Sequence, residues 1–558
     1  MGVSRVPERN NYIILTTEDL LPSATLFRDY RSNRYDVSIV TVEEIGSNKP
    51  PNIRRYLKDH YSRGYLLILG GEESVPRPLL YPSSQNHDFS NTAPGAVESD
   101  IFYSLSGNID YDGDGFPGEL FDDRVNFEAS YVVGRIPFDD NSMIEKVFEN
   151  IVKFEDNPPD KAVLAASFVS FPGELYQGSH IFNGDGARLS ELLRGIIPCK
   201  VVTLYEKQGS FPSIFDCHLP LDKENFYNEI RDASFVNWCA HGSLTDAFSE
   251  YWVDKNENGA PDDGFTFKSF ISAEDNFKAS GIFFSDSCLN EKNGNNLGKA
   301  VLEKGGVAFI GSTEISFTPS YFHSPEDGGS QCINYYFVKN LVEGNSVGKS
   351  LYNAFDIYFD KHLFSDLEDP FESGLMNIYD FNLYGDPAVI WSFEDNFVSP
   401  PLIAERTLES FPIVFHCSGE FELSVDLPRK DDYFIKLPPH SLYVTSVSVD
   451  GVIVDNAFGI VRLNGVGGEV KIKGRARGTA FAEVSVFTDE VQNNASIEIS
   501  GYNLRDINFD GVVNESDFKG MVESFGKTYM DEGFNEFCDL NFDHKVSGRD
   551  IFIFIFGD

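Results

Sequence analysis

Two apolar runs, each followed by a chemically reactive side chain, constrain this sequence more than any other feature. One covers residues 235–239 and leads into His241 and Gly242, and the other covers residues 282–285 and leads to Cys288. A short apolar run bounded by turn residues is typical of a strand buried on both faces of a parallel sheet. Open α/β sheets bind ligands outside the carboxyl ends of their strands. If the two strands are parallel neighbours, the imidazole and the thiol therefore lie at one rim of one sheet.

Strand-like and helix-like segments alternate through the first 395 residues. Strands are expected at 12–17, 35–40, 65–71, 162–169, 200–204, 234–240, 282–285 and 307–310, and helices at 53–61, 184–194 and 297–304. This alternation predicts mainly parallel sheets. The break at Asn157-Pro158-Pro159 divides the region into two adjacent α/β units, an N-terminal subdomain at 1–155 and a second subdomain at 156–395.

The pattern changes after Ser399-Pro400-Pro401. Short alternating stretches such as 443–449 and 482–487 are separated by turn residues, which predicts an immunoglobulin-like β-sandwich over residues 396–498. Residues 499–558 differ again and are expected to form a small separate module.

Charge and cysteine usage exclude several classes of function. The formal net charge of −42 over 558 residues repels nucleic acid and anionic membrane surfaces, so neither is expected as a partner. No apolar run reaches the length of a transmembrane helix, so no membrane insertion is expected. The seven cysteines are widely spaced without a Cys-x-x-Cys motif, which disfavours a disulfide framework and a zinc site.

The final module carries two twelve-residue loops with oxygen-bearing residues at positions 1, 3, 5, 9 and 12. The predicted ligands, with position 7 acting through its main-chain carbonyl, are Asp506, Asn508, Asp510, Val512, Asn514 and Asp517 in the first loop and Asp539, Asn541, Asp543, Lys545, Ser547 and Asp550 in the second. Ca²⁺ needs six to eight hard oxygen donors arranged around one point. One such loop alone could be a surface turn, but two in tandem predict calcium as a cofactor.

Two weaker clusters have part of the same spacing. The predicted ligands are Asp254, Asn256, Asn258, Ala260 and Asp262 in one cluster and Asp110, Asp112 and Asp114 in the other. Each could instead be an Asx-rich turn. A calcium ion in the first cluster would brace the wall beside His241.

The last sixty residues resemble a dockerin, a paired calcium module that docks onto a cohesin. The resemblance covers residues 501–558, with Asp at position 12 of both loops and a second helix expected at 551–556. The chain departs from dockerins at positions 10 and 11 of both loops and at His544, where Gly is usual. The resemblance implies a cohesin-type partner.

His241 and Cys288 together suit nucleophilic catalysis. A thiol must become a thiolate to attack a carbonyl, and histidine is the side chain best able to move that proton near neutral pH. The main-chain N–H groups of Gly242 and Cys288 could form an oxyanion hole. Taken alone, His241 could be a core histidine and Cys288 an inert buried thiol, but the joint pattern favours a catalytic pair.

The region from residue 12 to residue 391 resembles gingipain-type cysteine peptidases, family C25 of the caspase-like clan. The matching segments are 65–71, 75–76, 99–100, 134–137, 236–243, 286–288, 305–313 and 381–388. The resemblance implies a caspase-like α/β fold, with His241 as general acid/base, Cys288 as nucleophile and Gly242 as an oxyanion-hole donor. The chain departs from the family at Ala240 and at 289–291, where glycine is frequent.

The resemblance also places an acid near the histidine and another in the specificity pocket, both within residues 168–185. The candidates there are Glu174, His180 and Asp185. A carboxylate in the pocket would favour Arg or Lys before the cleaved bond, through charge-assisted hydrogen bonds. If His180 occupies the pocket instead, this basic preference does not follow.

The sequence therefore predicts a calcium-dependent cysteine endopeptidase that acts on protein or peptide substrates and docks to a cohesin-type partner. The alternatives are an inactive calcium-binding scaffold or adhesion protein with a peptidase fold, and an acyl transferase or transpeptidase using the same pair. The first eleven residues lack an apolar export core, which fits either a cytosolic protein or one whose export segment has been removed. Because calcium loops suit an extracellular setting, we expect a secreted or cell-surface protein.

Overall fold

The computed structural model of the chain forms two compact units. They cover residues 1–171, 183–366 and 370–403 in the first unit, and 172–182, 367–369 and 404–558 in the second. Within these, the structure describes residues 10–82, 95–120, 123, 125, 127–171, 175–176, 179–180, 184–256, 264–319, 322, 324–361, 373–393, 407–408, 410–438, 441–450, 452–455, 459–488, 491–527, 535–540 and 546–556.

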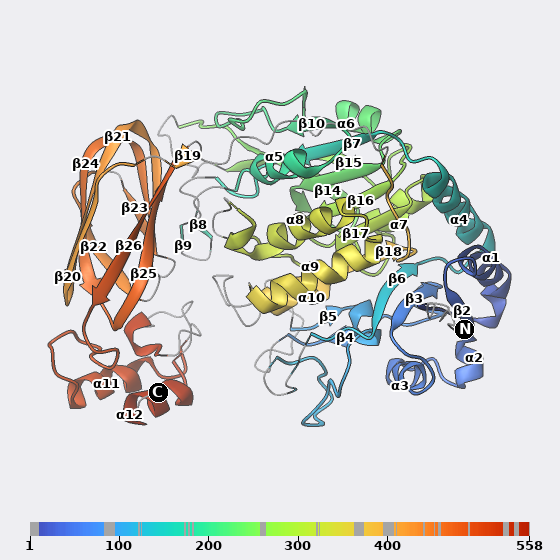
Figure 1. The fold of residues 1–558 in the computed structure, drawn as a ribbon, viewed down its shortest axis with the longest axis horizontal. Coiled ribbons are helices and arrows are strands. Elements are labelled where there is room, and N and C mark those ends of the chain that lie inside the picture. Colours follow the sequence, from blue (N-terminus) through green and yellow to red (C-terminus); the bar gives the residue numbers. More distant parts are fainter. Residues whose placement is uncertain are drawn as a thin grey trace, which may run out of the picture. The chain divides into compact units, whose positions relative to one another are not determined.

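The first unit is built on a sheet of 11 strands, in the order β11-β10-β7-β12-β16-β17-β18-β6-β3-β1-β2 (Figure 1). The strands are β1 (Asn11–Thr16), β2 (Asp36–Thr41), β3 (Gly64–Leu69), β6 (Tyr131–Ile136), β7 (Lys161–Ala166), β10 (Lys200–Tyr205), β11 (Leu219–Pro220), β12 (Phe235–Cys239), β16 (Ile282–Asp286), β17 (Ala308–Ser312) and β18 (Phe381–Gly385). The predicted mainly parallel α/β architecture is confirmed.

The sheet has two internally parallel halves that run in opposite directions. Every neighbouring pair from β11 to β17 is parallel, β17 and β18 are antiparallel, and the remaining pairs from β18 to β2 are parallel again. Strands from the first 155 residues lie in one half, whereas those from 161 to 312 make up the other. The predicted subdomain boundary stays a prediction, and both predicted subdomains supply strands to the same sheet.

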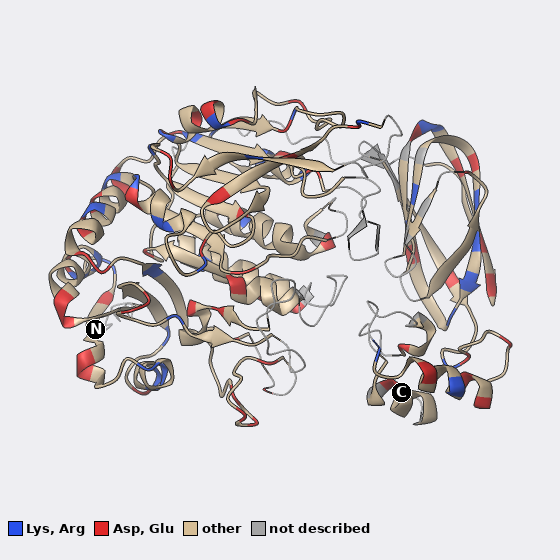
Figure 2. Ribbon diagram, turned by 180° about the vertical axis from the view of Figure 1, so that it is seen from behind, with Lys and Arg blue, Asp and Glu red and all other residues tan. Residues whose placement is uncertain are grey.

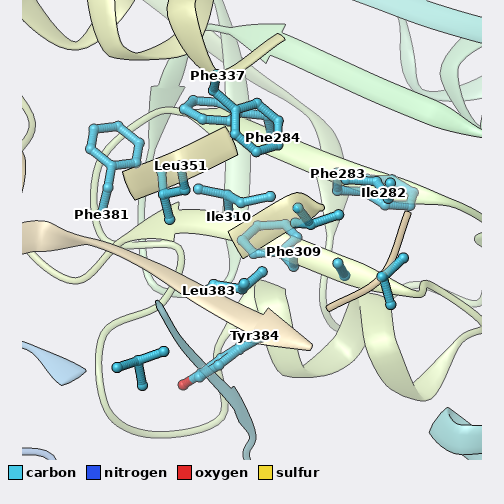
Figure 3. Packing of buried hydrophobic residues seen from close by; sticks show 14 of the residues in the cluster. Ile282, Phe283, Phe284, Phe309, Ile310, Phe337, Leu351, Phe381, Leu383 and Tyr384 are labelled. Atoms are coloured by element: carbon cyan, nitrogen blue, oxygen red, sulfur yellow. The ribbon is translucent and has the colours of Figure 1, made fainter. Parts of the chain in front are cut away.

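Continuous apolar runs form the central strands because both faces of the sheet are covered. Phe284 of β16 lies 5.1 Å, between ring centroids, from Phe337 and 5.5 Å from Phe381 (Figure 3). Ile310 and Leu351 belong to the same buried cluster. Each fully buried side chain of this kind contributes about 1.5–3 kcal/mol, so this packing stabilises the centre of the sheet.

Helices connect the strands in sequence and cover the sheet (Figure 1). They are η1 (Glu18–Leu20), α1 (Leu21–Arg31), α2 (Val42–Ile45), α3 (Pro50–His60), η2 (Asp100–Tyr103), α4 (Asn141–Asp156), α5 (Ala187–Ile196), α6 (Lys223–Ile230), α7 (Leu297–Glu303), η3 (Pro325–Asp327), α8 (Gly329–Val342), α9 (Val347–Lys361) and α10 (Ser373–Asp380). The predicted helices at 53–61, 184–194 and 297–304 correspond to α3, α5 and α7.

Two small antiparallel sheets complete the first unit. They consist of β4 (Leu79–Leu80) with β5 (Val97–Glu98), and of β13 (His241–Gly242), β14 (Asp246–Trp252) and β15 (Phe265–Ser272). The second of these begins at the predicted catalytic histidine, and its pairing determines which side chains surround that residue.

The second unit contains an eight-stranded, mainly antiparallel sheet. Its strands are β19 (Thr407–Leu408), β20 (Ile413–Ser418), β21 (Glu420–Lys436), β22 (Leu442–Val447), β23 (Ile453–Asp455), β24 (Ile460–Ala476), β25 (Thr479–Phe487) and β26 (Val491–Ser500), and a separate hairpin joins β8 (Leu175–Tyr176) to β9 (Ser179–His180). The strand-rich character expected of residues 396–498 is present, and its immunoglobulin-like arrangement stays a prediction.

After β26 the chain becomes helical, with α11 (Glu515–Ser524), η4 (Glu536–Cys538) and α12 (Gly548–Phe556). The helix expected at 551–556 is thus confirmed. Acidic residues occur in both units, on helices, strands and loops alike (Figure 2). Within the described segments, no helix has the length and apolar character needed to cross a bilayer.

A buried ion pair joins the start of η2 to β6. The Arg135 guanidinium donates to both carboxylate oxygens of Asp100 at 2.7 and 2.6 Å, and to the carbonyl oxygens of Gly70 and Val75. Arg135 is fully buried and Asp100 is nearly so. The two arginines Arg135 and Arg77 lower the pKa of the Asp100 carboxyl, in spite of a burial effect that acts to raise it.

Replacing Arg135 with Met should lower the free energy of unfolding by about 3–5 kcal/mol, because it leaves a buried carboxylate without its main partner. Thermal and urea unfolding of the full chain measure the change. Arg63→Met is the matched control, since Arg63 and its partner Glu128 are both exposed and such pairs contribute about 0–1 kcal/mol. Equal losses in the two variants would contradict this assignment.

Candidate active site

The carboxyl ends of β12 and β16 meet at one rim of the sheet. The strands are parallel neighbours, with Cys239 opposite Asp286, and the N–H of Ala240 donates to the carbonyl oxygen of Asp286 at 3.1 Å. His241 follows β12 by two positions and Cys288 follows β16 by two positions. The predicted juxtaposition of these two strand ends is confirmed.

Gly242 brings the histidine segment against the main chain of Cys288. A Cβ atom placed at position 242 would lie 2.4 Å from the carbonyl oxygen of Cys288 and 3.0 Å from both Cβ and Oγ of Ser287. Real Cβ atoms do not approach a main-chain oxygen so closely. A glycine is therefore required where the two loops touch.

A carboxylate that sequence reasoning missed holds the His241 imidazole. β13 pairs with β14 so that His241 lies opposite Phe248, and Glu250, two positions further along β14, points to the same face. Its Oε2 lies 2.8 Å from His241 Nε2, and the Glu250 side chain is only 3% exposed. One sequence signal could have predicted this contact. Glu250 is an acidic residue in an alternating segment, β14, which follows His241-Gly242 closely enough to form a hairpin with it.

Two further groups restrain this pair. The N–H of Glu250 donates to the Ser167 hydroxyl at 2.7 Å, which connects β14 to the segment after β7. The ring of Phe267 meets the imidazole edge-on at a centroid distance of 5.4 Å. The imidazole, 35% exposed, thus keeps a face toward solvent while one nitrogen is held by a buried acid.

The Cys288 thiol is half-buried at the same rim. Its Sγ lies 3.9 Å from both the carbonyl oxygen and the Oγ of Ser316. Burial raises the pKa of the thiol, and the nearby carboxyls of Asp380 and Asp286 act in the same direction, whereas the Ser316 contacts act to lower it. Together these effects keep the pKa of the Cys288 thiol above its ordinary value.

The residue after Cys288 has a left-handed backbone. Leu289 has φ +66°, a conformation that glycine adopts freely and that costs other residues about 1–3 kcal/mol. Its N–H donates to the carbonyl oxygen of Glu314 at 3.0 Å. The turn after Cys288 thus has a leucine in a conformation that favours glycine.

Asp286 is a buried acid two residues before Cys288. Its Oδ2 accepts from Asn334 Nδ2 at 3.2 Å, and Asn334 in turn accepts from Asn237 Nδ2 at 2.6 Å. Burial raises the pKa of Asp286 to about 6, partly offset by hydrogen bonds from Ser330 and Asn334. The rim thus contains a carboxyl that changes charge just below neutral pH.

The three predicted pocket residues have different outcomes. Glu174 lies outside the described residues, and only the main chain of His180, in β9, is described. Asp185 pairs with Phe168 in an isolated bridge, and its Oδ1 accepts from the N–H of Ala187 at 3.0 Å at the start of α5. Burial raises the pKa of the Asp185 carboxyl. A pocket role for these residues stays a prediction.

The first predicted calcium loop is closed by its own carboxylates. Asp506 accepts from the N–H groups of Asp510 and Gly511 at 3.1 and 2.8 Å. Asp517, at position 12, accepts from the N–H of Ile507 at 2.8 Å and from that of Asn514 at 2.8 Å. The predicted ligand side chains thus surround a tight loop that leads into α11.

The second loop repeats these bonds where it is described. Asp550 accepts from the N–H of Leu540 at 2.8 Å and from that of Ser547 at 2.8 Å, which matches Asp517 shifted by 33 positions. Asp539 is buried like Asp506, whereas Asn541, Asp543 and Lys545 lie outside the described residues. The module core repeats too, since Ile507 and Leu540, and Met521 and Phe554, form one cluster.

The acidic cluster near residue 110 gains two members that spacing alone did not reveal. Single carboxylate oxygens of Asp110, Asp112 and Asp123 lie within 4.8 Å of one another, as do those of Asp112, Asp114 and Glu119. Asp123 also accepts from the N–H groups of Tyr111, Gly118 and Glu119. Carboxylate oxygens of this kind fit Ca²⁺.

The cluster near residue 254 is described only in part. Asp254 and Asn256 are described, whereas Asn258, Ala260 and Asp262 lie outside the described residues. The N–H of Asp254 donates to Ser210 Oγ at 3.0 Å. The predicted calcium position beside the histidine strand stays a prediction.

A mainly parallel α/β sheet with a histidine and a cysteine at one rim is the arrangement expected of a caspase-like cysteine peptidase. Residues 5–392 match the family described as Peptidase family C25, and the chain belongs to this family of cysteine peptidases. A solved structure entitled "Structure of Protease" is similar to this chain with 12% sequence identity and a TM-score of 0.44, over 88% of this chain and 98% of that one. No curated protein sequence matches the chain.

Replacing Asp286 with Asn should change how stability depends on pH. An acid whose folded-state pKa lies near 6 rather than 3.8 binds its proton more tightly when folded, so it lowers stability as pH rises through this window. The variant lacks this effect. Its stability relative to the wild type should therefore increase by about 2 kcal/mol between pH 4 and pH 7.

Urea unfolding of both proteins at pH 4, 5, 6 and 7 measures the difference. A difference that stays constant across this range would show that the Asp286 carboxyl does not titrate in the window.

Proposed function

We propose that this chain is a cysteine endopeptidase in which Cys288 is the nucleophile and His241 moves the proton. The observation that carries the proposal is the contact of the two strand ends, where Gly242 packs on the main chain of Cys288 while a buried carboxylate holds the imidazole. Membership of family C25 supports the same chemistry.

The hydrogen bond to Glu250 assigns different roles to the two imidazole nitrogens. With Nε2–H of His241 donating to the carboxylate, Nδ1 carries the lone pair that accepts the Cys288 proton. Transfer of the thiol proton to Nδ1 accompanies attack on the substrate carbonyl. The buried negative charge of Glu250 stabilises the imidazolium that results.

The remaining steps use main-chain groups and water. The Cys288 sulfur bonds to the carbonyl carbon, and the oxygen becomes an oxyanion that accepts from the N–H groups of Cys288 and Gly242. Within the described part of the chain, the N–H of Cys288 has no hydrogen-bond partner, which suits this role. His241 then protonates the leaving amine, and water attacks the thioester to release the acid and restore the thiol.

The Cys288→Ala variant should lose peptidase activity about 10³-fold or more, because no other group supplies the nucleophile. The assay is a panel of fluorogenic peptides with Arg, Lys, Asp or Asn before the cleaved bond. Each bond is placed in the interior of a longer peptide, so that endopeptidase cleavage is distinguished from cleavage at the ends. Cys417→Ala, at a half-buried cysteine of β20, is the matched control and should retain activity.

Unchanged hydrolysis in Cys288→Ala would remove the proposed nucleophile. An added amine that captures most of the product, detected by mass spectrometry, would instead indicate acyl transfer with the same residues. Complete inactivity of the wild type on every peptide would favour the scaffold alternative.

We further propose that residues 499–558 bind Ca²⁺ and dock onto a cohesin-type partner, and that this protein is secreted or lies at the cell surface. Asp506 and Asp517 of the first loop and Asp539 and Asp550 of the second are buried at positions that repeat between the loops, which suits ligands that converge on an ion. Asn508, Asp510 and Asn514 would complete the first site, with the Val512 carbonyl, and Ca²⁺ would neutralise the gathered carboxylates.

Exposed apolar side chains on the two helices support docking. Val522 and Phe525 at the end of α11 are 55% and 52% exposed, and Phe552 and Ile555 of α12 are 59% and 52% exposed. Val522 and Ile555 occupy equivalent positions, 33 residues apart. Apolar residues gathered on a small module are typical of a protein-binding surface.

Chelation should lower the thermal stability of the wild type, and Asp506→Ala should reduce the number of Ca²⁺ ions bound by one. Isothermal titration of the chelator-treated full chain measures the stoichiometry. Glu523→Gln is the matched control, since this exposed acid pairs with Lys519 on α11 and is not a loop ligand. An unchanged stoichiometry in Asp506→Ala would contradict the first calcium site.

A further inference from the structure

Asn290 is a fully buried amide that bonds to both loops of the candidate active site. Its Oδ1 accepts from the hydroxyls of Ser285 and Ser287, each at 2.7 Å. Its Nδ2 donates to the main-chain carbonyl oxygens of Ser243 and of Asp246, the latter at 3.1 Å. One side chain thus joins the strand end that carries Cys288 to the turn that follows His241.

The partners of this amide determine its orientation. Two carbonyl oxygens can only accept, so the NH₂ group must face the histidine turn and the oxygen must face the serines. Trp238 Nε1 donates to the Ser287 hydroxyl at 3.0 Å. That hydroxyl therefore accepts from the indole, and its own hydrogen faces Asn290 Oδ1 and the Ser285 hydroxyl, 2.7 and 2.8 Å away. Both hydrogens and the oxygen of the amide are therefore used.

The turn that Asn290 holds is the one that sets the position of His241. Ser243 N–H donates to the Asp246 carbonyl at 2.9 Å, and this bond closes the hairpin between β13 and β14. The Leu244 carbonyl accepts from the N–H of Leu297 at 2.9 Å, at the start of α7. Asn290 supplies the bonds to the two carbonyls at the ends of the turn.

We infer that Asn290 is a positioning residue for the proton transfer between Cys288 and His241. This inference rests on the proposed function, because the separation of Cys288 and His241 affects the rate only if these two residues react. By joining the two loops, the amide fixes the distance between the thiol and the imidazole. Both the proton transfer and the attack on the substrate depend on this distance. A displacement of about 1 Å between reacting groups costs about 100-fold in rate.

Asn290→Asp is the sharpest test, because it keeps the shape of the side chain and replaces two N–H donors with an acceptor that faces two carbonyls. We expect kcat per active site to fall about 10- to 100-fold, with KM for a good peptide substrate changed less than threefold. Active sites are counted by covalent labelling of Cys288, and rates are measured well below the unfolding midpoint so that only folded enzyme is compared.

Asn382→Asp is the matched control. Asn382 is also a buried amide that donates to two carbonyl oxygens, those of Tyr379 and Asp380, and accepts from the N–H of Asp100. It lies in β18, and none of its hydrogen bonds to described residues reaches the histidine turn or the cysteine loop. This variant should lose stability but keep the wild-type kcat per active site.

Asn290→Ala provides a second variant if Asn290→Asp does not fold, since it leaves space for water to reach the carbonyls, and it should show the same loss of kcat. A wild-type kcat per active site in either folded Asn290 variant would overturn the positioning role while leaving the peptidase intact. Absence of Cys288-dependent hydrolysis in the wild type would instead overturn the proposed function itself.

Discussion

The parallel pairing of β12 with β16 is the interaction on which the rest of the site depends. Its register places Cys239 opposite Asp286, so the residues two positions beyond each strand emerge at one rim. This register is held by apolar side chains buried on both faces of the sheet, such as Trp238 and Phe284. A slip of one position would turn every such side chain to the opposite face, which is why the location of His241 and Cys288 is a property of the core.

Polar contacts then refine what the core positions. Glu250 holds one imidazole nitrogen, Asn290 joins the two loops, and Gly242 allows their main chains to touch. Glu250 and Asn290 are both buried, where leaving a polar group unpaired costs about 1–3 kcal/mol. Such networks favour one arrangement of the rim over its alternatives, and they give the His241 imidazole a buried carboxylate that can balance its charge.

Local pattern predicted the strands because each apolar run, such as 235–239 or 282–285, carries its own signal. It did not predict that the sheet reverses direction at β18, since strand direction depends on which distant segments pair. Glu250 and Asn290 escaped notice for a related reason. Both are single polar residues whose role appears only when a hairpin or a neighbouring strand end brings them to His241.

The calcium loops show the same division. The residue spacing in 506–517 predicted a compact loop. The hydrogen bond from the N–H of Ile507 to the Asp517 carboxylate forms because the two ends of this loop lie close together. Asp123 could not be added to Asp110 and Asp112 from spacing, because it reaches them across an irregular segment. The sequence thus predicts ligands that lie within one short loop, whereas ligands from more distant segments become apparent only from the tertiary contacts.

The most direct test of the shared rim is to map which cysteine reacts with a peptidyl chloromethyl ketone. Cys217, Cys288 and Cys417 are all half-buried, so accessibility alone would label the three at similar rates. Proximity to the imidazole predicts that Cys288 is labelled far faster than the other two and that His241→Ala removes this advantage. Equal labelling of the three cysteines, or a rate at Cys288 that His241→Ala leaves unchanged, would contradict the meeting of thiol and imidazole at this rim.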